Sequence, residues 1–162
     1  MRERRTPRSD PWFDLTRLLR ERPRSVSEVR ERLARRGHDE DAVEATIRDA
    51  VDAGLLDDRV FAKLWVADRL LHHPLSRAAI EQELRDKGIE PSIVASEIES
   101  QYPAVREIEL ARDLAATRFD RMSGVDPNRR RDRTASYLMR RGFRRGVALD
   151  VIRQIEKEHE DG

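Results

Sequence analysis

The stretch that decides the fold reads Ser25-Val-Ser-Glu-Val-Arg-Glu-Arg-Leu-Ala-Arg-Arg-Gly37. Aligned on the final glycine, two later stretches share its layout: Ser76-Arg-Ala-Ala-Ile-Glu-Gln-Glu-Leu-Arg-Asp-Lys-Gly88 and Arg130-Arg-Asp-Arg-Thr-Ala-Ser-Tyr-Leu-Met-Arg-Arg-Gly142. In each copy a leucine lies four residues before the glycine, a basic residue directly precedes it, and an isoleucine follows ten residues later. The glycines are 51 and 54 residues apart, so the chain contains three copies of one unit.

Each copy has the pattern of a short helix that ends at its glycine. Ser25 and Glu28 have the spacing of a capping box, in which both side chains satisfy free amides at a helix start. Val29 and Leu33 are four residues apart, which places them on one helix face. Glycine can adopt positive φ and therefore end the helix, and the basic residue before it favours the negative end of the helix dipole.

A second helix is expected after each glycine. Asp39 can cap the first of these helices, and Glu90-Pro91 starts the second, since proline is tolerated at the first helical position. The third start, at Phe143-Arg-Arg-Gly146, lacks a good capping residue. The inward stripe expected for the first helix, which Gly54 should end, is Val43, Ile47, Ala50 and Val51.

A further helix precedes each pair. These helices are expected at residues 14–21, 58–71 and 105–119. The inward residues expected on the last one are Ile108, Ala111, Leu114, Ala115 and Phe119.

The resulting fold class is all-α: an elongated tandem array of three three-helix, helix-turn-helix-like repeats. A unit of about 50 residues has only a small core, so neighbouring repeats are expected to pack against one another. The predicted boundaries are a basic N-terminal tail at 1–13 and repeats at 14–56, 57–102 and 103–162.

The composition excludes several classes of protein. The chain has no cysteine, which excludes disulfides, thiol catalysis and thiolate metal sites. No stretch of about 18 apolar residues occurs, so no membrane span is expected. Met1-Arg-Glu-Arg-Arg-Thr-Pro7 has no apolar stretch behind it and does not resemble a secretory signal. We therefore expect a cytoplasmic protein that contacts no membrane.

Candidate catalytic and metal-binding residues are few. His72 and His73 are adjacent, and adjacent residues point about 100° apart on a helix, unlike the pair spaced four apart that clamps a metal. Asp57 and Asp58 follow a turn at a helix start, where acids cap free amides. No phosphate loop or nucleophile elbow occurs. We predict no enzyme activity, no cofactor and no metal.

Charge is the remaining signal. The net charge of +1 conceals blocks: residues 17–36 hold eight arginines and three glutamates, residues 39–58 hold eight acids and one arginine, and residues 129–145 hold eight arginines and one aspartate. The basic residues are 30 Arg against 3 Lys, which genomic base composition explains as well as selection for binding does. The arginine runs are either a solvated surface or a contact for phosphates or an acidic protein face.

Several stretches resemble the RecX family. The most recognisable block is Gly54-Leu-Leu-Asp-Asp-Arg-Val-Phe-Ala62, continuing to Arg69 and followed by a helix ending Glu83-Leu-Arg-Asp-Lys-Gly-Ile89. Residues 27–37 and 137–143 also resemble their RecX counterparts, so the resemblance covers roughly residues 14–156. One departure is the loop His72-His-Pro-Leu-Ser-Arg77, where relatives often have a glycine and more basic residues.

The resemblance implies a regulator of the RecA recombinase, and thus a part in homologous recombination and the SOS response. RecX proteins consist of tandem three-helix repeats and lie along the groove of the RecA–DNA filament. There they suppress ATP hydrolysis and strand exchange, and they bind single- or double-stranded DNA more weakly.

We therefore predict a monomeric, non-enzymatic inhibitor or modulator of RecA. One alternative is a stand-alone DNA-binding protein that contacts duplex phosphates, and another is a scaffold without any link to nucleic acid. Candidate contacts with RecA or DNA are the arginine run of the third repeat and the basic residues near the glycines of the other two. They are Arg35, Arg36, Lys87, Arg129, Arg130, Arg133, Arg140, Arg141, Arg144 and Arg145.

Overall fold

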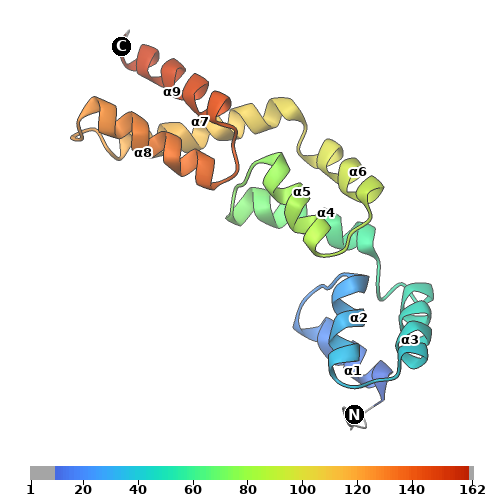
Figure 1. Cartoon of the computed structure of the whole chain (residues 1–162). Coiled ribbons are helices and arrows are strands. Elements are labelled where there is room, and N and C mark those ends of the chain that lie inside the picture. Colours follow the sequence, from blue (N-terminus) through green and yellow to red (C-terminus); the bar gives the residue numbers. More distant parts are fainter. Residues whose placement is uncertain (1–9, 161–162) are drawn as a thin grey trace. The chain divides into compact units, whose positions relative to one another are not determined.

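The computed structural model describes residues 10–160, and the expectations about residues 1–9 lie outside this range. The described residues form helices without any strand, which confirms the all-α class (Figure 1). The helices are α1 (Pro11–Glu21), α2 (Val26–Arg35), α3 (Glu40–Asp52), α4 (Asp58–His72), α5 (Arg77–Asp86), α6 (Pro91–Gln101), α7 (Ala104–Asp120), α8 (Pro127–Arg140) and α9 (Arg145–Glu160).

The described residues divide into two compact bodies. The N-terminal body comprises residues up to 65 together with 84–94, and the C-terminal body comprises residues 66–83 together with those from 95 onward. Helices α4, α5 and α6 each contribute residues to both bodies. Each body is described by itself below.

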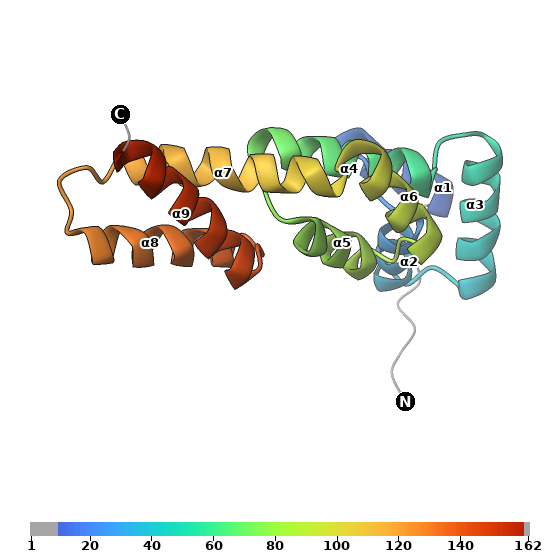
Figure 2. The ribbon, with the colours of Figure 1, turned by 90° about the horizontal axis from the view of Figure 1, so that it is seen from above.

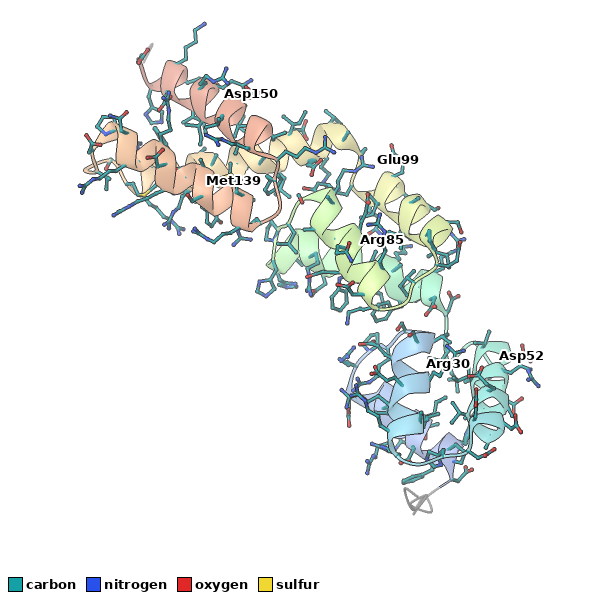
Figure 3. The ribbon with its side chains drawn as sticks, in the orientation of Figure 1. Arg30, Asp52, Arg85, Glu99, Met139 and Asp150 are labelled. Carbon is teal, nitrogen blue, oxygen red and sulfur yellow. The ribbon has the colours of Figure 1, made fainter. Side chains whose placement is uncertain are left out.

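The core of the N-terminal body lies among α1, α2 and α3. Helix α2 begins with the predicted capping box: the Glu28 amide donates to Ser25 Oγ at 3.1 Å, and the Ser25 amide donates to Glu28 Oε2 at 3.2 Å. Arg30 on α2, labelled in Figure 3, donates to Glu44 on α3 at 2.6 Å. The buried cluster consists of Leu15, Leu18, Val29, Leu33, Val43, Ile47, Ala50 and Leu56.

Asp57 and Asp58 cap helices as predicted, whereas Asp39, also predicted to cap, occupies the N-cap position of α3 without a side-chain cap hydrogen bond. Asp57 Oδ1 accepts from the amides of Arg59 at 2.8 Å and Val60 at 3.1 Å, at the start of α4. Asp58 Oδ1 accepts from the Val26 amide at 2.9 Å and therefore satisfies the start of α2, in the preceding repeat. The role predicted for this acid pair is confirmed, although Asp58 performs it on a different helix.

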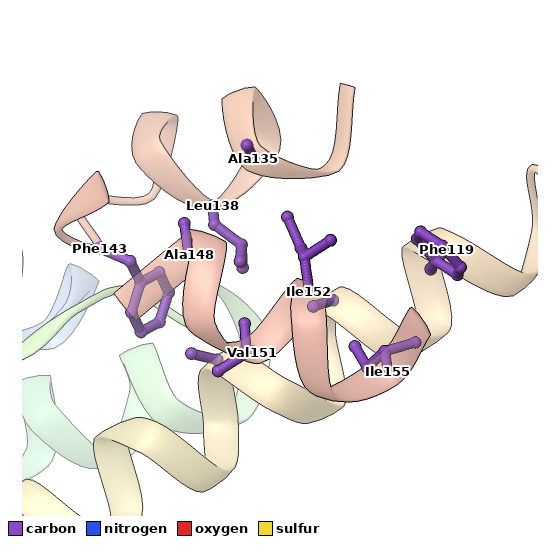
Figure 4. Close-up of a cluster of buried hydrophobic side chains, with 10 residues drawn as sticks. Phe119, Ala135, Leu138, Phe143, Ala148, Val151, Ile152 and Ile155 are labelled. Atoms are coloured by element: carbon purple, nitrogen blue, oxygen red, sulfur yellow. The ribbon is translucent and has the colours of Figure 1, made fainter. Parts of the chain in front are cut away.

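The core of the C-terminal body lies among α7, α8 and α9, which are side by side in Figures 1 and 2. Leu138 of α8 and Ile152 of α9 are fully buried, and Phe119 of α7 closes one end of the cluster (Figure 4). Phe143, in the turn after α8, is also buried there. Helix α8 begins at Pro127, with the Asp126 side chain accepting from the Arg129 amide at 3.1 Å.

Two residues predicted to face inward are exposed. Val51 lies at the edge of the α3 stripe, about 80° around the helix from Val43, and α1 and α2 do not cover it. Ile108 lies in the first part of α7, before Leu110, where the cluster with α8 and α9 begins. Both predictions were wrong because helical period alone does not show how far a partner helix extends.

Candidate partner-binding surface

The basic residue and glycine that end α5 pack against the start of α2. Ser25 Oγ donates to the Lys87 carbonyl at 2.7 Å, and Lys87 Nζ lies 3.1 Å from Glu28 Oε1. The same ammonium lies 4.3 Å from the centre of the Trp65 ring. Lys87 therefore connects the second repeat to the first within the N-terminal body.

Glu28 is held ionised at this junction. Burial alone would raise its pKa, but hydrogen bonds from Arg22, from Lys87 and from the Ser25 amide together lower the pKa to about 2. Glu28 thus serves the capping box and the contact between repeats at once.

The C-terminal body contains the equivalent junction. The Ser76 amide donates to the Arg141 carbonyl at 2.9 Å, and Arg141 Nη1 donates to the Pro74 carbonyl at 2.7 Å. The Arg141 guanidinium also lies 4.8 Å from the centre of the Tyr137 ring. In both bodies, the basic residue and glycine of one repeat contact the start of the middle helix of the repeat before it.

The glycines are required by close approach as well as by backbone conformation. Gly88 has φ 73°, and a Cβ added there would lie 2.5 Å from Ser27 Cβ. Gly142 has φ 88°, and its added Cβ would lie 2.5 Å from Ser76 Oγ. A side chain at either position would separate the two repeats.

The first repeat uses its basic residue differently. Arg36 pairs with Asp14, whose carboxylate is buried, and His38 Nε2 lies 2.8 Å from the other Asp14 oxygen. Arg35 is exposed and pairs with Glu31 one turn earlier on α2. These two arginines lie at the C-terminal end of α2, whereas Lys87 lies at its N-terminal end, so the structure does not bring them together.

Arg130 is committed to the inside of the third repeat. Its Nε donates to the Phe119 carbonyl at 2.8 Å, and its guanidinium lies 3.5 Å from the centre of the Phe119 ring. Together with Arg36, Lys87 and Arg141, it is a predicted contact residue that the fold itself uses.

Three predicted residues share one exposed line on α8. Arg129, Arg133 and Arg140 are exposed, and their side chains have no hydrogen-bond or ion-pair partner among residues 10–160. At 100° per residue they fall within about 40° of each other, along about 16 Å of helix. We call these three residues the α8 arginine stripe. Arg144 and Arg145, at the turn into α9, are also exposed and without such a partner in that range.

Unpaired guanidinium groups in a line suit an extended anionic surface. Each can bind a phosphate or a carboxylate through two parallel hydrogen bonds. Tyr137 takes no part in the stripe, because it is half-buried against the core with the Arg118 and Arg141 guanidinium groups near its ring. It packs against the core of the third repeat.

The part of the chain that the structure describes contains neither a metal-ion cluster nor a helix that could span a membrane. Between residues 10 and 160, no group of three or more acidic or histidine side chains is placed to hold a metal ion. In the same part of the chain, no helix combines the length and the apolar character that crossing a membrane requires.

The contact between repeats was not visible in the sequence. Ser25 was identified as a helix cap, and Ser76 occupies the same aligned position. The shared serine was the available signal, but nothing in it indicates which carbonyl it meets. Arg36 was missed as an internal residue because its partner, Asp14, lies 22 residues away.

Comparison with known proteins places these features in one family. Models of the first, second and third three-helix domains of RecX match residues 16–48, 57–96 and 106–155. The organisation into three three-helix repeats is thereby confirmed, while the boundaries between them remain predictions.

Several curated relatives carry the name Regulatory protein RecX. The one from Streptomyces coelicolor is 38% identical over 146 residues, which cover 90% of this chain and 77% of the relative. The one from Amycolatopsis mediterranei is 34% identical and covers 88% of this chain and 81% of its own length. The crystal structure of RecX from Lactobacillus salivarius has the same fold, with a TM-score of 0.76 at 20% identity, covering 90% of this chain and 94% of that one.

Proposed function

This chain belongs to the RecX family, and we propose on that basis that it regulates the RecA recombinase without catalysing a reaction of its own. It binds as a monomer in the groove of the RecA–DNA filament, in the cytoplasm. It occupies the space that a second duplex would enter and restrains the subunit motions that ATP hydrolysis needs. Both ATP hydrolysis and strand exchange therefore fall.

The observation that carries the proposal is the match of all three RecX domain models, in order along the chain. The curated relatives are named regulatory proteins, which agrees with a role exerted on a partner. The α8 arginine stripe, with Arg144 and Arg145, supports a contact with DNA phosphates or an acidic face of RecA. Within the candidate set, these five residues and Arg35 are the exposed ones.

The test is a titration of the chain into RecA assembled on single-stranded DNA with ATP. We expect the steady-state ATPase rate and the yield of strand exchange to fall together as the chain is added. Unchanged rates at several-fold molar excess over RecA would reject the proposal.

The second candidate is a stand-alone DNA-binding protein, which the unpaired arginines also favour. About six phosphate contacts would give a slope near −5 in a plot of log affinity against log salt concentration. Tight binding to bare duplex with such a slope, unaffected by RecA, would favour this candidate. Weak binding to bare duplex, together with inhibition of RecA, favours the first.

A further inference from the structure

The N-terminal body carries a hollow that its core does not fill. Its volume is about 320 Å³, which is at the lower end for a ligand site and suited to one or two side chains of a partner protein. It lies between the loop after α1, the loop after α3 and the first half of α4. Its apolar lining includes Leu19, Pro23, Leu55, Val60 and Leu64.

The apolar side chains around the hollow are unusually open to solvent. Leu55, Val60 and Leu64 are 48%, 52% and 50% exposed. Val60 and Leu64 are one helical turn apart on α4, so they present one face. Grouped exposed apolar side chains of this kind typically mark an interaction site.

Leu55 is the residue of the stretch 54–58 whose side chain has no structural role in the fold. Within Gly54-Leu-Leu-Asp-Asp58, Gly54 provides positive φ, Leu56 is buried, and both aspartates cap helices. The side chain of Leu55 remains half-exposed at the hollow. A role in contacting a partner explains it.

Arg24 provides a second, independent observation. The residue lines the hollow and is only 6% exposed. Its Nε donates to the Leu18 carbonyl at 3.2 Å and its Nη2 to Glu21 at 2.7 Å, but its buried Nη1 has no acceptor among the described residues. A buried charged donor without an acceptor is unfavourable, and each such group in a folded protein requires an explanation.

Local features of the hollow favour a carboxylate beside Arg24. Asp57, an acid in the lining, has one carboxylate oxygen committed to two amides of α4. The N-terminal turn of α4 borders the hollow and adds the positive end of a helix dipole. The segment 17–36, which contains Arg24, has eight arginines against three glutamates. The segment 39–58, which supplies Leu55 and Asp57 to the lining, has eight acids against one arginine, so the attraction for a carboxylate is confined to the guanidinium of Arg24 and the start of α4.

The structure around the hollow indicates which secondary structure a bound partner segment would have. Strand addition needs an open sheet edge, and residues 10–160 contain no strand. Recognition of a proline-rich segment needs an open aromatic groove, whereas Phe61 is the aromatic residue of this lining and is buried. Insertion of an apolar helix face is the remaining common mode.

We propose that this hollow binds an acidic amphipathic helix of a partner protein, which inserts a leucine-like side chain beside Leu55 and Leu64 and supplies a carboxylate to Arg24. The hollow belongs to the N-terminal body and shares no residue with the α8 arginine stripe, and the proposal does not depend on the action on RecA.

The test is a nuclear magnetic resonance titration of the full chain, labelled so that the Arg24 Nε–Hε signal and the Leu55, Val60 and Leu64 methyl signals are observed. The probe is a synthetic alanine-based helical peptide of about 20 residues, with two leucines four positions apart on one face and glutamates on the opposite face. We expect saturable shifts at these four residues. A peptide with lysine in place of glutamate should bind about tenfold more weakly or worse, since a charge-assisted hydrogen bond is lost.

Variants separate binding from folding. Leu64→Glu puts a carboxylate at the hollow and should weaken binding of the acidic peptide by about tenfold or more. Leu71→Glu on the same helix is the matched control, because Leu71 is 75% exposed and does not line the hollow, and it should bind normally. Arg24→Lys is a second variant of the site, and Leu64→Glu keeps the test valid if Arg24→Lys fails to fold.

Four results would overturn the proposal. The first is the absence of shifts at about 1 mM peptide, and the second is equal binding of the lysine peptide. The third is a dimer, seen by sedimentation without peptide and lost in Leu64→Glu, which would make a second copy of the chain the occupant. The fourth is displacement of the peptide by duplex DNA accompanied by the same Arg24 shift, which would make a phosphate the acceptor.

Discussion

At the scale of single residues, the glycine that ends α5 has two functions. It takes a left-handed backbone conformation, as the sequence predicted, and it lets α2 approach closely. Gly54 has nearly the same φ, 71°, but an added Cβ there meets nothing within 4 Å. Replacing Gly54 therefore tests backbone strain alone, whereas replacing Gly88 tests backbone strain together with the contact between repeats.

Gly88→Ala should destabilise the protein more than Gly54→Ala. We expect Gly54→Ala to cost about 1–2 kcal/mol from positive φ alone. Gly88→Ala should cost at least 1 kcal/mol more, on the order of a local packing defect, because Ser27 must move away. Urea denaturation of both variants measures the difference. Equal losses would mean that the close contact with Ser27 contributes nothing.

Glu28 should make the stability of the first junction depend on pH. Its pKa is lowered to about 2 in the folded protein, below its ordinary value of 4.5. The stabilisation from ionised Glu28 is therefore complete above pH 4.5 and is lost as pH falls from 4.5 toward 2. Wild type should exceed Glu28→Gln by on the order of 1 kcal/mol at pH 7, and less at pH 3. A gap that stays constant between these pH values, in urea titrations, contradicts this role.

At the scale of helices, α8 has one face buried in the core and one face exposed to solvent. Thr134, Ala135 and Leu138 are buried, while Arg129, Arg133 and Arg140 are exposed. The sequence showed a run of arginines here without showing which of them the fold uses. The α8 arginine stripe could not be predicted, because it consists of the arginines that the fold leaves without a partner. Arg130 and Arg141 are excluded from it by hydrogen bonds to the carbonyls of Phe119 and Pro74, which lie outside α8.

Leu138→Ala tests the buried face. Leu138 is fully buried in the cluster of Figure 4, so its truncation should cost about 2–5 kcal/mol of unfolding free energy. Met139→Ala, at the exposed neighbouring position, should cost less than about 1 kcal/mol. Thermal or urea unfolding of the pair checks this. Similar losses for both variants would show that the helix is rotated from its described position.

The triple variant Arg129→Glu, Arg133→Glu, Arg140→Glu tests the exposed face. We expect the concentration that halves RecA ATPase activity to rise by about tenfold or more, since attraction becomes repulsion along the stripe. The fold should persist, because these side chains have no partner among residues 10–160. The control reverses Arg17, Arg32 and Arg48, which are exposed on α1, α2 and α3 and also lack a side-chain hydrogen-bond or ion-pair partner among residues 10–160, and should leave inhibition near wild type. If both triple variants weaken inhibition equally, the total charge of the chain matters and the position of the stripe does not.

At the scale of the whole molecule, the sequence predicted the helices well because their ends are local. The capping box of α2, the Asp57 cap of α4 and the glycine ends each involve neighbours within a few residues, whereas the bond from Asp58 to the start of α2 spans 32 residues and was not predicted. The contacts between repeats are different, since Ser25 and Lys87 are 62 residues apart. Periodicity cannot show which helix start receives which helix end, so the internal roles of Lys87 and Arg141 emerged only from the structure.

The central claim, that this chain acts on RecA filaments, is tested most directly by capture of RecA on the immobilised chain. The experiment is done with and without single-stranded DNA and ATP, at fixed salt. We predict strong retention of RecA when both are present, and much weaker retention of RecA or of DNA alone. Failure to retain RecA under every condition, or retention of DNA alone as strong as that of the assembled filament, would contradict it.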